Sequence, residues 1–202
     1  MKNKVIKVGF DLDGVLLYNP ARIARPIIYF LKKIFLKRKI DKFYYPKNKF
    51  EKFIWLLLHK SSFFPQSGID EIKKLIKNKK IKAYVISARY ESLKDDFLLW
   101  KKKIDPEDLF SGWYYNEKDE QPYEFKAKMI KKLNLDIFVE DNWDIVKKLK
   151  VNHVRRGQKL KVKKIKIFWI YNLLDRNIKY KYKFSSLKEV INFIRKMLNV
   201  RC

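Results

Sequence analysis

Cysteine and long apolar runs are what this 202-residue sequence lacks most clearly. The only cysteine is the last residue, Cys202, so no internal disulfide can form, as is usual for proteins of a reducing compartment. The apolar runs at residues 5–10 and 53–58 are too short for a signal-peptide core or a membrane span. We therefore expect a cytoplasmic protein with no transmembrane segment.

Acidic residues are also scarce. The chain has 49 lysines and arginines against 22 acids, which gives a formal net charge of +27. A field of this sign attracts phosphates, nucleic acid and anionic lipid headgroups. The basic residues are spread through nearly every segment, so a composition bias of the gene explains them as well as a selected surface does. We expect at most a weak association with polyanions, and the sequence leaves the oligomeric state open.

Short apolar segments alternate with amphipathic ones along most of the chain. Strands are expected at residues 5–10, 81–86, 112–115, 136–139 and 165–171, and helices at residues 69–79, 91–103, 123–133, 143–150 and 186–198. This alternation predicts an α/β fold with a Rossmann-like, five-stranded parallel sheet and helices on both faces.

Residues 18–66 interrupt the alternation. They contain no strand candidate, and residues 20–39 and 47–60 have helical patterns. We predict a small helical cap at residues 18–66, inserted after the first strand, and a core formed by residues 1–17 and 67–202. The aromatic residues of this segment either form the core of the cap or stack on a substrate base.

The stretch VGFDLDGVLL places two carboxylates at the end of the first strand. Residues two apart on a strand point the same way, so Asp11 and Asp13 can face one pocket, and Gly14 allows a sharp turn after them. Carboxylates this close repel unless a cation compensates, and Mg²⁺ prefers such oxygen ligands. The alternative is an acidic turn whose side chains are solvated.

Further polar residues follow other strands or begin helices. Ser87 follows the second strand, where its hydroxyl and the next backbone N–H, that of Ala88, suit a phosphate oxygen, although a serine there also caps helices. Lys126 begins an amphipathic helix, with Lys128 as the alternative in the same region.

An acidic pair, Glu140 and Asp141, ends the strand at residues 136–139. Ligands bind at the carboxyl ends of the strands in parallel sheets, so this pair lies where a metal site is expected. The alternative is a second solvated acidic turn.

Four motifs together resemble the haloacid dehalogenase superfamily of Mg²⁺-dependent phosphatases and phosphotransferases. They are DLDGV at residues 11–15, VISAR at residues 85–89, the KAxxI helix from Lys126, and FVEDN at residues 138–142. Their order and spacing agree with the superfamily over almost the whole chain. The sequence looks most similar to the branch of deoxyribonucleotidases and related nucleotidase-like proteins, which carry a small helical cap between the first two motifs.

The resemblance implies a role for each acid. Asp11 would be the nucleophile that forms an aspartyl-phosphate, and Asp13 the general acid and then the general base. Mg²⁺ would be bound by Asp11, by the main-chain carbonyl of Asp13, and by Glu140 or Asp141. The fourth motif has Glu-Asp where Asp-Asp is commoner, so either of these two acids can be the direct ligand.

The resemblance also implies contacts to the substrate. Ser87 and Lys126 would neutralise the phosphoryl oxygens, with the backbone N–H groups of Leu12 and Ala88 as further phosphate contacts. Arg89 would either reach the substrate or form a salt bridge with the following helix.

These residues predict a Mg²⁺-dependent phosphomonoester hydrolase that acts on a small phosphorylated metabolite such as a nucleotide. One alternative is a phosphatase for nucleic-acid ends, whose backbone the positive charge would bind. Another is a non-catalytic RNA- or membrane-binding protein of the same fold, attached through basic helices such as residues 23–39. The intact set of acids favours an enzyme.

Overall fold

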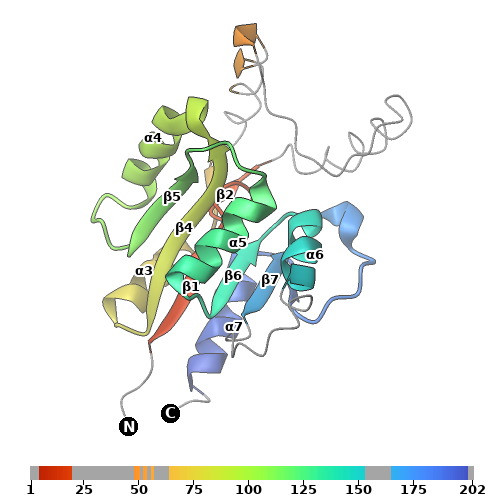
Figure 1. Ribbon diagram of the computed structural model, residues 1–202. Coiled ribbons are helices and arrows are strands. Elements are labelled where there is room, and N and C mark those ends of the chain that lie inside the picture. The colour runs from red at the N-terminus through yellow and green to blue at the C-terminus, as the bar shows by residue number, and fades with distance from the viewer. Residues whose placement is uncertain are drawn as a thin grey trace.

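The computed structural model describes residues 5–19, 48–50, 52–53, 56, 64–152 and 165–199 (Figure 1). The helix predicted at residues 20–39 lies outside these ranges, and only isolated positions of the one predicted at 47–60 fall within them. The cap and the two domain boundaries therefore remain predictions. No helix in the described ranges combines the length and the apolar character that crossing a membrane requires.

The centre of the fold is a six-stranded sheet in the order β5-β4-β1-β6-β7-β8. The strands are β1 (Ile6–Phe10), β4 (Ile81–Tyr90), β5 (Gly112–Asn116), β6 (Ile137–Glu140), β7 (Lys166–Ile170) and β8 (Lys183–Phe184). All five pairings are parallel, so the predicted α/β class is confirmed. The sheet has six strands rather than five because β8, which pairs Lys183 with Trp169, is too short to give a sequence pattern.

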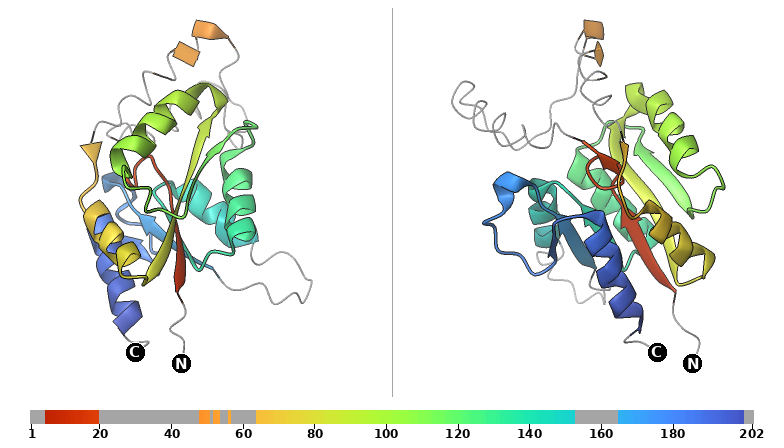
Figure 2. Two further views of the ribbon diagram at one scale, coloured as in Figure 1. Left: turned by 90° about the vertical axis from the view of Figure 1, so that its left-hand side faces the viewer. Right: turned by 180° about the vertical axis from the view of Figure 1, so that it is seen from behind.

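Helices cover both faces of this sheet (Figures 1 and 2). They are α3 (Ile69–Lys77), α4 (Lys94–Ile104), α5 (Pro122–Leu133), α6 (Trp143–Asn152) and α7 (Leu187–Asn199). The first two and α7 pack on one face, and α5 and α6 on the other. Neighbouring strand residues point to opposite faces. Val85 belongs to the apolar core beneath α3, α4 and α7, and Ile86 to the core beneath α5 and α6.

Local sequence fixes where α5 begins and ends. Pro122 occupies its first turn, where the missing N–H costs nothing, and Asn134 ends it in the left-handed conformation with φ of 51°. Between these ends, one helical face buries Phe125, Lys126 and Met129 among other residues. The buried lysine on this otherwise apolar face is the first sign of a charged site below the helix.

Strand β4 is longer than the sequence predicts. We expected it to end at Ile86, but it continues to Tyr90, with a shift in its register against β5 between these two residues. The β-branched pattern stops at Ile86, whereas pairing resumes at Tyr90 opposite Asn116. Ser87 and Arg89 therefore lie within the strand and not after it, which corrects the predicted boundary.

A second, two-stranded sheet joins the ends of the inserted segment. β2 (Leu17–Tyr18) and β3 (Phe64–Pro65) are antiparallel, with Tyr18 opposite Phe64. The expectation of no strand in residues 18–66 is therefore wrong at both margins. Two-residue strands carry no periodic pattern, so only tertiary pairing reveals them. The chain leaves and re-enters the core at adjacent points.

Candidate active site

The site begins in a tight turn after β1, the third strand of the sheet. The backbone N–H of Asp11 donates to the carbonyl of Val139 at 3.0 Å, which ties the turn to β6. Gly14 has φ of 83°, which glycine adopts readily, and its N–H donates to the carbonyl of Leu17 at 2.8 Å. The N–H of Leu12 donates to Oδ1 of Asp11 at 2.8 Å. The Asp11 carboxylate is thus fixed at the carboxyl edge of the sheet.

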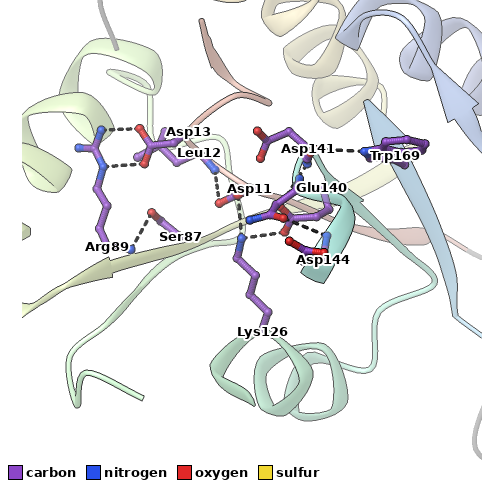
Figure 3. Close-up of polar contacts among 11 residues, drawn as sticks. Asp11, Leu12, Asp13, Ser87, Arg89, Lys126, Glu140, Asp141, Asp144 and Trp169 are labelled. Carbon is purple, nitrogen blue, oxygen red and sulfur yellow. Dashed lines mark hydrogen bonds and ion pairs between the residues drawn. The ribbon is translucent and has the colours of Figure 1, made fainter. Parts of the chain in front are cut away.

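Lys126 of α5 reaches this carboxylate from the face of the sheet that α5 and α6 cover (Figure 3). Its Nζ lies 2.7 Å from Oδ2 of Asp11 and 2.7 Å from Oε2 of Glu140. Lys128, the alternative from sequence, instead has a largely exposed ammonium that pairs with Glu120. The structure therefore places Lys126, and not Lys128, beside Asp11.

Glu140 and Asp141 complete the cluster from the end of β6. Oε1 of Glu140 accepts the backbone N–H of Asp141 at 3.1 Å and that of Asn142 at 2.9 Å. The indole N–H of Trp169, on β7, donates to the main-chain carbonyl of Asp141 at 3.1 Å (Figure 3). These bonds hold the turn in one shape, and the contribution of Trp169 had no signal in the sequence.

The donor set suits a hard divalent cation. Asp11, Glu140 and Asp141 each offer a carboxylate oxygen, and the three oxygens lie within 4.8 Å of one another. The three residues are only 6%, 0% and 3% exposed. When all are ionised, the three carboxylates carry three negative charges and Lys126 carries one positive charge, which leaves two negative charges to balance. An all-oxygen set with this deficit fits Mg²⁺ better than a softer metal. The carbonyl of Asp13 remains a predicted ligand.

Burial and charge perturb the pKa values of Asp11, Glu140 and Lys126. Burial raises the pKa of Asp11, and the nearby ammonium of Lys126 offsets only part of this. Burial likewise raises the pKa of Glu140 to about 8, although Lys126 acts in the opposite direction. Burial lowers the pKa of Lys126, but Asp11 and Glu140 outweigh it and leave that pKa raised. Without a metal, protons therefore supply part of the missing positive charge.

The stability of the metal-free protein should fall as the pH rises from about 5 to about 8. Folded Glu140 has a pKa of about 8 against an ordinary value of 4.5, so the folded state binds more protons than the unfolded state in this window. The contribution of Glu140 to the stability of the folded state is complete below its ordinary pKa. This contribution is lost as the pH rises through the pKa of Glu140 in the folded protein. Thermal unfolding in EDTA should show that the free energy of unfolding falls by on the order of 2 to 5 kcal/mol over this pH range.

Glu140→Gln is the matched variant for this measurement, because an amide has the same shape and does not titrate. Its unfolding midpoint should depend less on pH than that of the wild type, and added Mg²⁺ should remove most of the wild-type slope. Equal slopes in the wild type and the variant would contradict the assigned proton uptake.

Asp13 lies apart from this cluster and contacts Arg89. Nε and Nη2 of Arg89 donate to Oδ2 and Oδ1 of Asp13 at 2.9 and 2.8 Å, which makes a bidentate ion pair. Nη1 of Arg89 donates to Asp96 in the first turn of α4. Figure 3 shows the Asp13 side chain pointing toward Arg89 and away from Asp11. Of the two alternatives for Arg89, the structure shows the salt bridge to the following helix.

The remaining predicted phosphate contacts lie along the same edge. Ser87 is fully buried, and its Oγ accepts the backbone N–H of Arg89 at 3.2 Å. Ala88 is half-buried between them on β4. Leu12 follows Asp11, and its N–H is already used by the Asp11 carboxylate. The roles of these groups in binding a phosphate remain predictions.

Comparisons with known proteins identify the fold. No protein-family model matches the sequence, and no curated protein matches it. Among solved structures, CbbY from Rhodobacter sphaeroides in complex with phosphate is 12% identical, with a TM-score of 0.56 over 93% of this chain and 96% of that one. A HAD-superfamily hydrolase from Ehrlichia chaffeensis is 15% identical, with a TM-score of 0.51 over 98% of this chain and 100% of that one.

These likenesses show a HAD-like α/β fold, where HAD denotes haloacid dehalogenase. They agree with the fold that the resemblance of the four motifs implied, and they do not distinguish the nucleotidase branch. The acidic cluster lies at the carboxyl edge of the sheet, where ligands of parallel α/β folds bind.

Proposed function

We propose that this protein is a Mg²⁺-dependent phosphomonoester hydrolase that acts through an aspartyl-phosphate on Asp11. The observation that carries the proposal is the buried cluster of Asp11, Glu140 and Asp141, in which the ammonium of Lys126 contacts Asp11 and Glu140. Burying three carboxylates with one ammonium costs folding energy, so a structural role alone explains them poorly. Phosphoryl transfer through an aspartyl-phosphate requires both a carboxylate nucleophile and a compensating positive charge.

Each residue of the cluster has a separate task in this reaction. Asp11 attacks phosphorus with one carboxylate oxygen while the bond from phosphorus to the leaving oxygen breaks. Lys126 holds Asp11 in place and stabilises negative charge on the phosphoryl group. Glu140, Asp141 and Asp11 would bind Mg²⁺, which when bound neutralises phosphoryl oxygens and orients the phosphate.

Asp13 is the group we assign to proton transfer. It would donate a proton to the leaving oxygen in the first half-reaction and accept one from water in the second. Ser87 and the backbone N–H groups of Leu12 and Ala88 would contact the phosphate. Only Leu12 separates Asp13 from Asp11, so both tasks are served by one turn that Gly14 makes possible.

A small phosphorylated metabolite is the substrate class that we propose. CbbY has been determined with phosphate, and a mutant of it with xylulose-1,5-bisphosphate. Within this class a nucleotide is our specific proposal, since the motifs look most similar to the deoxyribonucleotidase branch. Cys202 as the only cysteine supports a cytoplasmic location.

The test is a phosphatase screen with and without Mg²⁺. The panel contains nucleotides, sugar phosphates, and oligonucleotides with 3′- or 5′-phosphates, and Asp11→Asn serves as the blank. We expect release of phosphate from small monoesters that EDTA abolishes. Selective activity on oligonucleotide ends would move the substrate to nucleic acid. No hydrolysis by folded, Mg²⁺-bound protein would refute the enzymatic function and favour a binding protein.

A further inference from the structure

The side chain of Arg89 is completely buried, which is unusual for a guanidinium. It belongs to β4, and both groups that face it are carboxylates from other elements: Asp13 in the turn after β1 and Asp96 in the first turn of α4. Burial lowers its pKa, but the two carboxylates outweigh this and leave the pKa raised. Arg89 is therefore always charged.

The geometry of this group restricts Asp13 strongly. Two donors of Arg89 occupy both oxygens of Asp13, and a third donor is anchored by Asp96. Because the guanidinium is planar, three anchored donors fix its plane and with it the orientation of the Asp13 carboxylate. Asp96 has a side chain only 15% exposed, so this anchor is itself well packed.

We propose that Arg89, anchored by Asp96, is the positioning residue that sets the orientation of Asp13 for proton transfer. The inference rests on the proposed phosphatase function. Within the described part of the chain, the Arg89 side chain bonds to Asp13 and Asp96 and to none of the carboxylates of the metal cluster, so it acts on the reaction through Asp13.

The proton inventory of the reaction makes this role testable. When Asp11 bonds to phosphorus, the leaving oxygen departs with the electron pair of the P–O bond and takes the proton of Asp13. When water attacks, the bond between phosphorus and Asp11 breaks and the proton of water returns to Asp13. An alcohol is a poor leaving group and needs the proton of Asp13 to depart, whereas an acidic phenol departs as its anion without that proton. Misplacing Asp13 should therefore harm esters of ordinary alcohols selectively.

The experiment compares benzyl phosphate with p-nitrophenyl phosphate, two monoesters of similar size. Values of kcat/KM are measured because they include the step in which the leaving group departs. Asp13→Asn is the reference and should lower kcat/KM for benzyl phosphate about 10²- to 10⁴-fold, with a much smaller loss for the nitrophenyl ester. Arg89→Lys and Asp96→Asn should show the same selectivity, with a loss of about tenfold or more on benzyl phosphate.

The variants are chosen so that folding does not decide the result. Arg89→Lys keeps the positive charge that the two partly buried carboxylates require but lacks the fork that orients Asp13. Asp96→Asn leaves Arg89 itself intact. Asp95→Asn is the matched control, because Asp95 is the exposed neighbour of Asp96 on the same helix, and it should change neither ester. Thermal unfolding verifies that each variant is folded.

A double variant gives the decisive comparison. Adding Arg89→Lys to Asp13→Asn should cause no further loss on benzyl phosphate, because the residue acts through Asp13. Equal losses on both esters, or additive losses in the double variant, would overturn the positioning role while wild-type activity and an inactive Asp11→Asn leave the proposed function standing. A wild type that hydrolyses neither ester and no member of the substrate panel would overturn both.

Discussion

Asp11→Asn is expected to abolish hydrolysis of every substrate, with a loss on the order of 10⁴-fold or more. The amide has nearly the same shape but is a poor nucleophile, and it removes one of the three carboxylates near the predicted metal. The Asp11 side chain is also one of the two partners of the Lys126 ammonium. Steady-state kinetics on the best substrate of the panel, with Mg²⁺ in excess, measures this loss.

The matched control is Asp144→Asn, which makes the same chemical change in an exposed carboxylate near the site. The Asp144 side chain is 60% exposed and pairs with Lys147 on its own helix, α6. This variant should keep its activity within about threefold, because an exposed pair contributes little. Activity of Asp11→Asn above about one per cent of the wild type would rule out a covalent aspartyl-phosphate on this residue.

Lys126→Met is expected to have the second-largest effect, on stability as well as on activity. The ammonium lies 2.7 Å from both Asp11 and Glu140, and the residue is 1% exposed. Methionine fills a similar volume but leaves the buried carboxylates without this partner, which should cost about 3 to 5 kcal/mol of unfolding free energy in EDTA. Loss of a charge that stabilises the phosphoryl group should lower kcat about 10²- to 10³-fold.

Lys128→Met is the matched control for Lys126→Met, because it makes the same change at an exposed position of the same helix. Lys128 is also on α5; its side chain is 58% exposed, and its ammonium pairs with Glu120 at 2.7 Å. This change should alter the unfolding free energy by less than about 1 kcal/mol and leave kcat unaffected. Mg²⁺ should restore part of the stability of Lys126→Met and little in Lys128→Met. Equal effects of the two substitutions would show that Lys126 has no special role in balancing the cluster.

The acidic cluster could be anticipated from sequence because of how parallel strands are arranged. Phe10 pairs with Val139, so the residues after them, Asp11 and Glu140, must lie at the same edge of the sheet. Lys126 could be anticipated less firmly, since a lysine two positions later had a similar claim. The position of each lysine around the helix axis distinguishes the two, because Lys126 faces the sheet and Lys128 faces solvent.

The partners of Arg89 could not be anticipated in the same way. A salt bridge to the following helix was one alternative, but nothing in the sequence distinguishes Asp96 from the exposed Asp95 beside it. The pairing with Asp13 depends on a side-chain orientation in the turn after β1, which only the folded structure defines. The short strands β2, β3 and β8 escaped prediction for a related reason, because pairing and not local pattern creates them.

The antiparallel pair of β2 and β3 allows the segment between them to vary without disturbing the acidic cluster. Because Tyr18 and Phe64 are opposite each other, the inserted segment is attached to the core through one narrow neck. When the ends of an insertion are already adjacent, changing its length or sequence costs little loop-closure entropy. Evolution can therefore change the length or the sequence of this segment without altering the connectivity of the six-stranded sheet. Such a change would leave Asp11, Glu140 and Asp141 in place at the carboxyl edge of the sheet.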